Sequence, residues 1–291
     1  MKKKLLLEGQ NQDERVLSFI RELVARFQPL YIIKFSESVK SKFASGSFME
    51  KIDVSSFHYH LLMVVEGTTR IEHGVQDFVN THFYHGKITI LVHSRETMEE
   101  AISANSRFFI HAFNTGILLY NHEGILNLFP QYILDEKQSL QKARVHFNHR
   151  IPMAKGFLVG AAECYSNRKY NVSVFMLHQT VEQCCIALIR IFMSYRADIH
   201  HLGKLLDLCC CFSEQPKEIF LNNEENSRLF KVLMDSCLHA RYRDNFNVDI
   251  DDADDLYRLV KTFFDLSKKL CEERINELSL ACGADELMIG G

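Results

Sequence analysis

Two polar residues of complementary chemistry stand four positions apart in the most apolar helical stretch of the sequence. His178 and Glu182 lie within residues 171–192, where apolar residues recur at the spacing of one helix face. Residues four apart lie one above the other on a helix, so an imidazole and a carboxylate share a face that we predict to be buried. The pair is either a core histidine satisfied by its neighbouring carboxylate or part of a polar pocket inside a helical bundle.

A second polar spacing occurs at His58 and His60, within a strand predicted over residues 57–65. Alternate residues of a strand project from the same face, and two imidazoles on one face can ligate a transition metal. A metal site needs a third ligand, which the spacing does not identify. The chain has 14 histidines, so chance alone also produces this spacing. We therefore predict no metal and no cofactor.

The overall composition excludes some partners and leaves others to local features. The chain has 291 residues, of which 47% are hydrophobic, and a formal net charge of -3. This balance gives no general attraction to nucleic acid, so such binding requires a local patch. No stretch approaches the roughly 20 apolar residues of a membrane span, and we predict no membrane partner. Nine cysteines without CxxC spacing or a signal peptide indicate a reducing compartment, so we predict a cytoplasmic protein.

The amino-terminal part of the chain alternates between helical and strand patterns. Apolar spacing predicts helices over 14–27, 71–79 and 95–105. Short apolar runs predict strands over 30–35, 57–65, 87–93 and 116–120, with an irregular connection between the first two. This alternation predicts a small α/β sheet domain over residues 1–130.

From residue 131 onward the patterns are helical only. A connecting helix over 138–150 is predicted to end at Pro152. Further helices are predicted over 157–165, 171–195, 201–212, 228–242 and 254–278. Helices with short connections predict an up-and-down bundle over 131–278, and the pattern-free residues 279–291 a flexible tail. The fold class is therefore α+β with two domains, a sheet domain followed by an all-α bundle.

The amino-terminal order of elements, closing with GILLY and NHEG at 116–124, resembles the minimal nucleotidyltransferase domain. In that family a Gly-Ser pair after the first strand holds the nucleotide phosphates, and two alternating carboxylates on the second strand hold magnesium. Here the first position reads Ser36-Glu37-Ser38 and the second His58-Tyr59-His60. Without the carboxylates, metal-dependent nucleotidyl transfer has no ligands. The resemblance therefore implies a degenerate nucleotidyltransferase-like domain, a pseudoenzyme.

The carboxy-terminal part resembles the HEPN domain, a helical bundle often found beside minimal nucleotidyltransferases. Three stretches carry this resemblance: VFMLHQTVEQCCIALI at 174–189, DIHHLGKLL at 198–206 and LHARYRDNFNVD at 238–249. They follow one another in the order of the family. The resemblance implies an up-and-down HEPN-like helical bundle and a homodimer formed through it.

Many HEPN domains are metal-independent ribonucleases with an arginine followed, after four to six residues, by a histidine. Arg241 is the matching arginine, and the positions where that histidine is expected hold Phe246, Asn247 and Val248. The resemblance therefore implies a non-catalytic protein that binds a nucleotide or RNA. The alternatives are a ribonuclease that uses an unorthodox histidine, such as His178 or His201, and a purely structural interaction protein.

The predicted ligand site is a polar cleft of the bundle in which imidazole and guanidinium groups bind phosphate and carboxylates orient them. Its residues are His178, Glu182, His201, Arg241, Tyr242 and Asp244. Arg241 and Asp244 are three residues apart, so they are alternatively an intrahelical ion pair on a solvated helix end.

Overall fold

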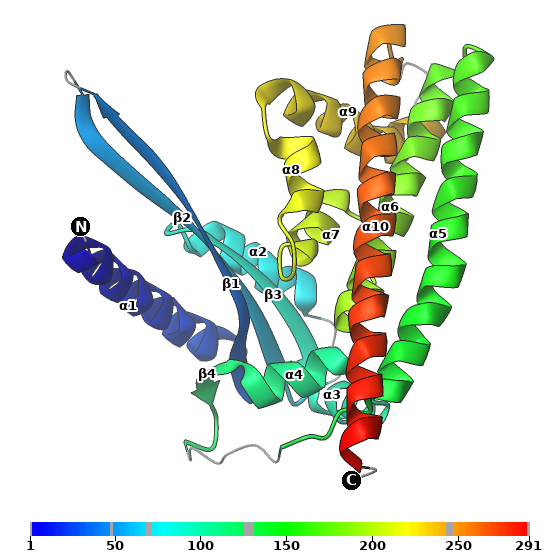
Figure 1. The fold of residues 1–291 in the computed structure, drawn as a ribbon. Helices are drawn as coiled ribbons and strands as arrows, with labels where there is room; N and C mark the ends of the chain where they lie inside the picture. The colour runs from blue at the N-terminus through cyan, green and yellow to red at the C-terminus, as the bar shows by residue number, and fades with distance from the viewer. Residues whose placement is uncertain (1, 47–48, 68–70, 125–130, 243–246, 290–291) are drawn as a thin grey trace. The chain divides into compact units, whose positions relative to one another are not determined.

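The computed structural model describes residues 2–46, 49–67, 71–124, 131–242 and 247–289. Side chains are described within 12–39, 56–67, 71–124, 131–238 and 247–282. The chain forms two compact units, Met1–Ile133 and Leu134–Gly291 (Figure 1).

Unit 1 is built on a mixed four-stranded sheet with the strand order β3-β2-β1-β4. Its strands are β1 (Tyr31–Gly46), β2 (Met49–Val65), β3 (Lys87–Ser94) and β4 (Ile117–Asn121). β1 pairs antiparallel with both β2 and β4, and β2 pairs parallel with β3. Within the central strands β1 and β2, the apolar stretches Ile32–Ile33 and Leu61–Val64 are buried on both faces of the sheet.

Helices cover the two faces of this sheet. α1 (Lys2–Phe27) and α2 (Glu72–His82) pack on one face, against a core of alternate strand residues that includes Tyr59, Leu61 and Met63. α3 (Arg95–Ser103) and α4 (Arg107–Thr115) contact strands β1 to β3. Residues next to Tyr59 in β2 project from the opposite face, since side chains alternate along a strand.

The structure of unit 1 differs from the sequence prediction at three places. The predicted irregular connection after residue 35 is instead a ribbon, in which β1 and β2 stay paired out to Gly46 and Met49. Backbone hydrogen bonds hold such a ribbon whatever its side chains are. The Ser- and Lys-rich composition therefore wrongly indicated an irregular connection. α1 begins at Lys2, earlier than predicted. The helix predicted over 95–105 is followed by a second one, because Asn105 adopts a left-handed conformation with φ 55° between α3 and α4.

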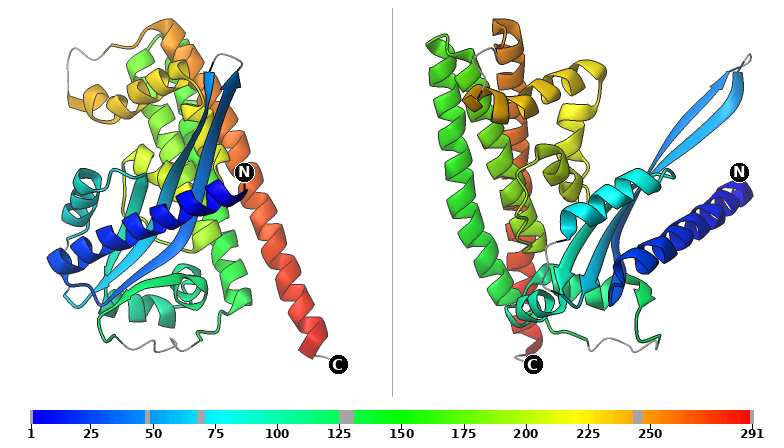
Figure 2. Two further views of the ribbon diagram at one scale, coloured as in Figure 1. Left: turned by 90° about the vertical axis from the view of Figure 1, so that its left-hand side faces the viewer. Right: turned by 180° about the vertical axis from the view of Figure 1, so that it is seen from behind.

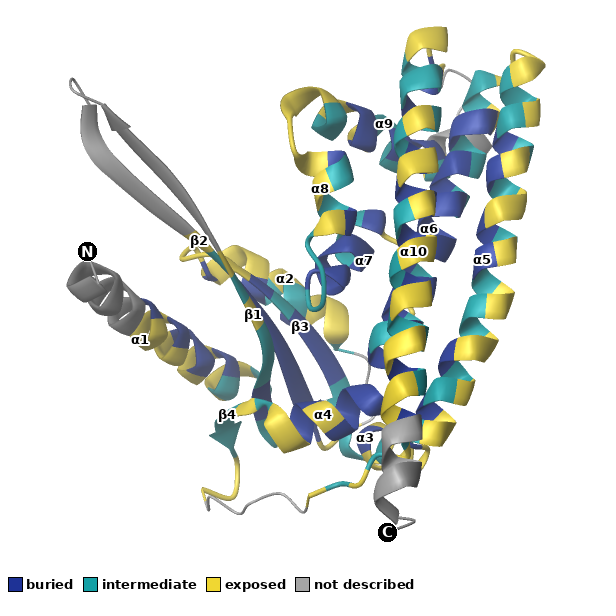
Figure 3. Cartoon of the chain, viewed as in Figure 1, coloured by how far each residue is buried: buried dark blue, intermediate teal, exposed yellow. Residues whose placement is uncertain are grey.

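All regular elements in the described part of unit 2 are helices. Its helices are α5 (Glu136–Ser166), α6 (Tyr170–Met193), α7 (Leu202–Cys209), α8 (Gln215–Leu221), α9 (Glu224–Tyr242) and α10 (Ile250–Ile289). The long helices α5, α6 and α10 pack against one another, and α6 also contacts α7 and α9 (Figure 2). Most of α6 is buried (Figure 3). The predicted α+β class with a sheet unit followed by a helical unit is confirmed.

Three predictions for unit 2 also need correction. Pro152 does not end a helix, because α5 continues to Ser166 and buries Ile151, Ala154 and Ala161 around it. A proline inside a helix removes one hydrogen bond, which this packing outweighs. A short helix, α8, forms where a polar excursion is predicted, with Pro216 in its first turn. α10 runs to Ile289 through residues predicted as a flexible tail, with Leu278 and Cys282 buried one turn apart.

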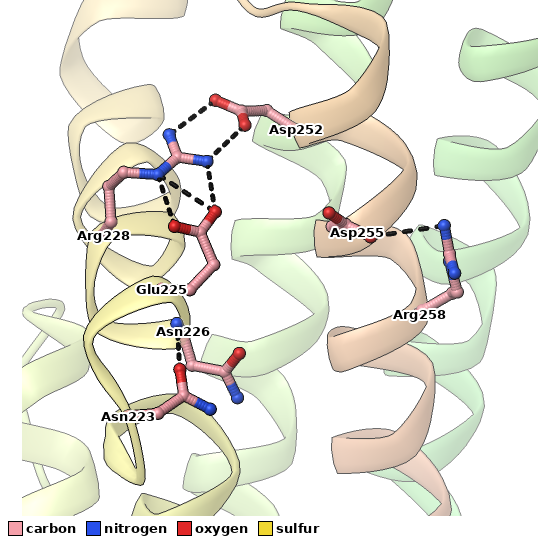
Figure 4. Close-up of polar contacts among 7 residues, drawn as sticks. All are labelled: Asn223, Glu225, Asn226, Arg228, Asp252, Asp255 and Arg258. Atoms are coloured by element: carbon pink, nitrogen blue, oxygen red, sulfur yellow. Dashed lines mark hydrogen bonds and ion pairs between the residues drawn. The ribbon is translucent and has the colours of Figure 1, made fainter.

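A charged network joins the first turns of α9 and α10. Arg228 donates to both carboxylate oxygens of Asp252, at 2.9 and 2.5 Å, and also to Glu225 (Figure 4). Arg258 pairs with Asp255 within α10, at 3.2 Å. The acidic start of α10 is thus engaged with arginines.

By length and composition, α6 alone among the described helices could cross a membrane. Most of its apolar stretch is buried inside unit 2, so it is the core helix of that unit.

Candidate functional site

The polar residues of α6 form a buried group. The side chains of His178 and Glu182 lie one turn apart, with 3.9 Å between the His178 Nδ1 and Glu182 Oε2 atoms. Only 2% of His178 and 6% of Glu182 are exposed. Gln179 bridges them, because its Nε2 lies 3.2 Å from His178 Nδ1 and donates to Glu182 Oε2 at 3.5 Å. The two predicted residues therefore meet inside the helical unit.

The buried carboxylate of Glu182 contacts the exposed imidazole of His200. The His200 Nδ1 atom lies 2.9 Å from the second carboxylate oxygen of Glu182. The His200 side chain is 85% exposed, whereas that of Glu182 is 8% exposed. Ser194, in a left-handed conformation with φ 52°, ends α6 and turns the chain into the segment that carries His200. A buried carboxylate thus orients a histidine at the surface.

The neighbouring His201, which the sequence predicts in the ligand site, also caps a helix through one of its ring nitrogens. Its Nδ1 accepts a hydrogen bond from the backbone N–H of Lys204, at 3.3 Å, and so caps α7. Sequence reasoning missed His200 because both histidines precede the apolar run of α7. The sequence signal that could have identified His200 is the position of His201 just before α7. A residue at that position accepts a hydrogen bond from a backbone N–H of the first helical turn, whereas the side chain of the residue before it does not.

The remaining predicted ligand residues are only partly described. Arg241 and Tyr242 belong to the last turn of α9, but their side chains lie outside the described residues, as does all of Asp244. The chain after them returns to the start of α6, where the backbone N–H of Val248 donates to Asn171 Oδ1 at 3.0 Å.

A second polar contact joins α5 to α6, between residues that the sequence did not single out. The Arg150 Nη1 atom donates to Gln183 Oε1 at 2.6 Å, and only 8% of Gln183 is exposed. Lys142, His146 and Arg150 recur every fourth residue along α5. That spacing of cations on one side of a helix is a sequence signal that could have identified them.

In unit 1, His58 and His60 project together from the sheet face opposite Tyr59. Their rings lie 4.1 Å apart, and His58 Nε2 lies 2.8 Å from Thr89 Oγ1. The His60 ring also packs 6.0 Å from that of Phe35. Among the side chains that the structure describes, no three possible metal ligands gather in one place. The pair is packed and hydrogen-bonded inside the unit.

The strand register brings side by side the two positions of unit 1 where the nucleotidyltransferase resemblance predicts motifs. Ser36 pairs with His60, and Ser38 with His58. None of these four positions carries a carboxylate, and Glu37 between the serines is bound by Lys34 at 2.5 Å. The carboxylate oxygens that usually hold Mg²⁺ are thus missing from these four positions.

Comparison with known proteins gives a family for the helical unit. Residues 147–270 match the HEPN domain family, which confirms the resemblance of this part of the chain. No curated protein matches the sequence. Among solved structures, a nucleotidyltransferase-like protein from Exiguobacterium sibiricum 255-15 is similar over 77% of this chain and 72% of that chain, with 11% identity and a TM-score of 0.21.

Proposed function

We propose that this chain, whose residues 147–270 match the HEPN domain family, binds a nucleotide or a nucleic acid without cleaving it. The observation that carries the proposal is the link from buried Glu182 to exposed His200, at 2.9 Å. Since a carboxylate holds Nδ1, the Nε2 atom of His200 is left to face a ligand. When both ring nitrogens carry protons, an imidazole oriented in this way donates from Nε2 to a phosphate oxygen in a charge-assisted hydrogen bond.

Two further residues hold the Glu182 carboxylate that contacts His200, so this contact differs from an ion pair between two mobile surface side chains. His178 and Gln179 interact with the other oxygen of Glu182, so that the carboxylate is fixed on both sides. A fixed carboxylate reduces the freedom that His200 would lose on binding a ligand. The predicted residues His201, Arg241, Tyr242 and Asp244 remain part of the proposed site, with His200 added to them.

Two features support binding over catalysis. The HEPN ribonuclease spacing after Arg241 lacks its histidine, and the nucleotidyltransferase motif positions of unit 1 hold serines and histidines. The proposal includes a homodimer formed through the helical unit and a cytoplasmic location, as the sequence predicts. Sedimentation at several protein concentrations tests the dimer.

The test of binding compares His200→Ala with the wild-type protein. Fluorescence anisotropy with a labelled oligoribonucleotide, and thermal shifts with mononucleotides, measure the affinity. Loss of one charge-assisted hydrogen bond is expected to weaken binding by about tenfold. Glu182→Gln, which keeps an acceptor for His200, is expected to weaken it less. His122→Ala, an exposed histidine of unit 1, is the matched control and should bind like the wild type.

Two outcomes would replace the proposal. RNA cleavage in the presence of EDTA that disappears in Arg241→Ala would make the protein a HEPN ribonuclease. Flat thermal-shift curves with all nucleotides, together with no RNA binding, would favour a structural interaction protein instead.

A further inference from the structure

Cationic side chains gather where α5 packs on α6. We define this basic stripe as Lys142, His146, His149 and Arg150 of α5, Arg190 of α6 and Arg196 of the segment after α6. Lys142, His146 and Arg150 follow one side of α5 at every fourth residue. These three and Arg190 are half-buried, so the stripe lies along the helix–helix seam.

Two cations of the stripe, Arg150 and Arg190, have no carboxylate partner among the side chains that the structure describes. Arg150 donates to the neutral amide oxygen of Gln183, at 2.6 Å, and this hydrogen bond brings no negative charge next to the guanidinium group. Arg190, two helical turns beyond Gln183, forms no hydrogen bond or ion pair with any side chain in the described part of the chain. Asp198 lies near this end, where its carboxylate binds Arg196 at 3.0 Å.

The titration behaviour of the stripe agrees with this excess of positive charge. Burial, then the cations Arg190, Arg150, His149 and Lys142, lower the pKa of His146. Burial, then Arg196 and Arg150, lower the pKa of Arg190, and Asp198 opposes this only in part. Groups whose protonated forms are disfavoured by neighbouring cations gain stability when an anion arrives.

We propose that the basic stripe binds the phosphate backbone of single-stranded RNA. From Lys142 to Arg150 the stripe extends roughly 12 Å along α5, which is longer than one phosphate group and suits a chain of repeated phosphates. The guanidinium groups of Arg150 and Arg190 can each bind two phosphate oxygens. Arg196 continues the stripe into the segment that carries His200. The inference rests on the proposed nucleic-acid binding and assigns its surface and ligand.

The test is the salt dependence of RNA binding. Anisotropy of a labelled oligouridylate of about 12 nucleotides is measured between about 50 and 200 mM KCl. Removing one cation that neutralises a phosphate reduces the slope of log affinity against log salt concentration by about 0.7 for a single strand. Lys142→Gln and Arg190→Gln are each expected to reduce the slope by about this amount, and the double variant by about twice it.

Two control variants distinguish the effect of a lost charge on RNA binding from the effect of a disturbed fold. Arg190→Lys keeps the cation and is expected to retain the wild-type slope. Lys155→Gln removes an exposed cation of α5 outside the stripe and should leave both affinity and slope unchanged. Circular dichroism melts of all variants verify that the helical unit is folded.

The results distinguish this inference from the proposed function. If RNA binds and His200→Ala weakens it, but the stripe variants match the wild type, the stripe is excluded and the proposed function stands. If ATP alone displaces the RNA at concentrations near its own Kd, the ligand is a mononucleotide and the RNA backbone is excluded. If the wild-type protein binds neither RNA nor ATP, the proposed function and the assignment of the basic stripe both fail.

Discussion

The guanidinium group of Arg228 clamps the carboxylate of Asp252 with two hydrogen bonds, and so ties the first turn of α9 to the first turn of α10 (Figure 4). These bonds, made by Arg228, lower the pKa of Asp252. Because that pKa is lower in the folded state than in the unfolded chain, the clamp stabilises the fold above the ordinary carboxyl range. Its contribution is lost as the pH falls through the folded-state pKa.

Arg228→Met is therefore expected to lower the free energy of unfolding of unit 2 at neutral pH by up to about 1 kcal/mol, since both groups are partly exposed. Urea unfolding at neutral pH and well below pH 4 measures the difference, which should vanish in acid. Arg258→Met is the control, because Arg258 pairs only with carboxylates of its own helix among the described residues. Equal losses in the two variants would mean that the α9–α10 link adds nothing.

The lowered pKa of His146 predicts a second pH dependence of the stability of unit 2. Burial and then the cations Arg190, Arg150, His149 and Lys142 lower its pKa, so the unfolded chain binds this proton more readily than the folded one. The contribution of His146 to stability is thus complete above about pH 6.5 and falls as the pH drops below that value. The decrease in Tm between about pH 7.5 and 5.5 should be smaller in His146→Gln than in the wild type.

An unchanged decrease in His146→Gln would contradict this account. His122→Gln, at an exposed position of unit 1, controls for histidines that do not face the stripe.

The cysteines of the helical core are expected to resist alkylation. Burial raises the pKa of the Cys184, Cys209 and Cys271 thiols, and raises that of Cys210 to about 12. Iodoacetamide reacts with thiolates, so these residues should stay unmodified near pH 8 in the folded protein, while half-buried Cys164 reacts. Mass spectrometry after short labelling measures each site, and denatured protein should label at all nine cysteines. Rapid labelling of Cys209 in the folded protein would show that the core opens.

Two glycine-to-alanine substitutions are expected to act in opposite directions. A Cβ atom on Gly116 would overlap the Ala112 carbonyl oxygen and lie 2.5 Å from Ile33 Cγ2. Gly116→Ala should destabilise unit 1 by about 1–3 kcal/mol. Gly156, inside α5, has open space around that position, so Gly156→Ala should stabilise unit 2 by up to about 1 kcal/mol. Thermal unfolding of each variant measures these changes. A Gly116→Ala protein as stable as the wild type would contradict the predicted overlap.

The sequence predicted those elements whose own residues fix their type. The apolar spacing of α6 and the apolar runs of β2 and β3 depend on burial, which is periodic in sequence. The ribbon of β1 and β2 was not predictable in this way, because cross-strand backbone bonds hold it. Pro152 predicts a helix end through its missing N–H, whereas the packing of α5 on α6 decides the outcome.

The candidate site was predictable in part for the same reason. His178 and Glu182 share a helix, so their spacing determines that they meet. His200 comes from a turn whose path depends on how α6 ends at Ser194, so the spacing of residues alone does not show that it meets Glu182. Arg150 and Arg190 lie on two different helices, so only the packing of α5 on α6 shows that their charges accumulate.

The short turn between α5 and α6 has a consequence for the order of folding. Only residues 167–169 separate the two helices, with Arg168 in a left-handed conformation, and Ser173 on α6 donates to the Ala161 carbonyl at 2.8 Å. Contacts between neighbours in the chain cost little loop-closure entropy and form early. This helical hairpin can therefore assemble as the nucleus of its unit during synthesis, before the ribosome has delivered α10.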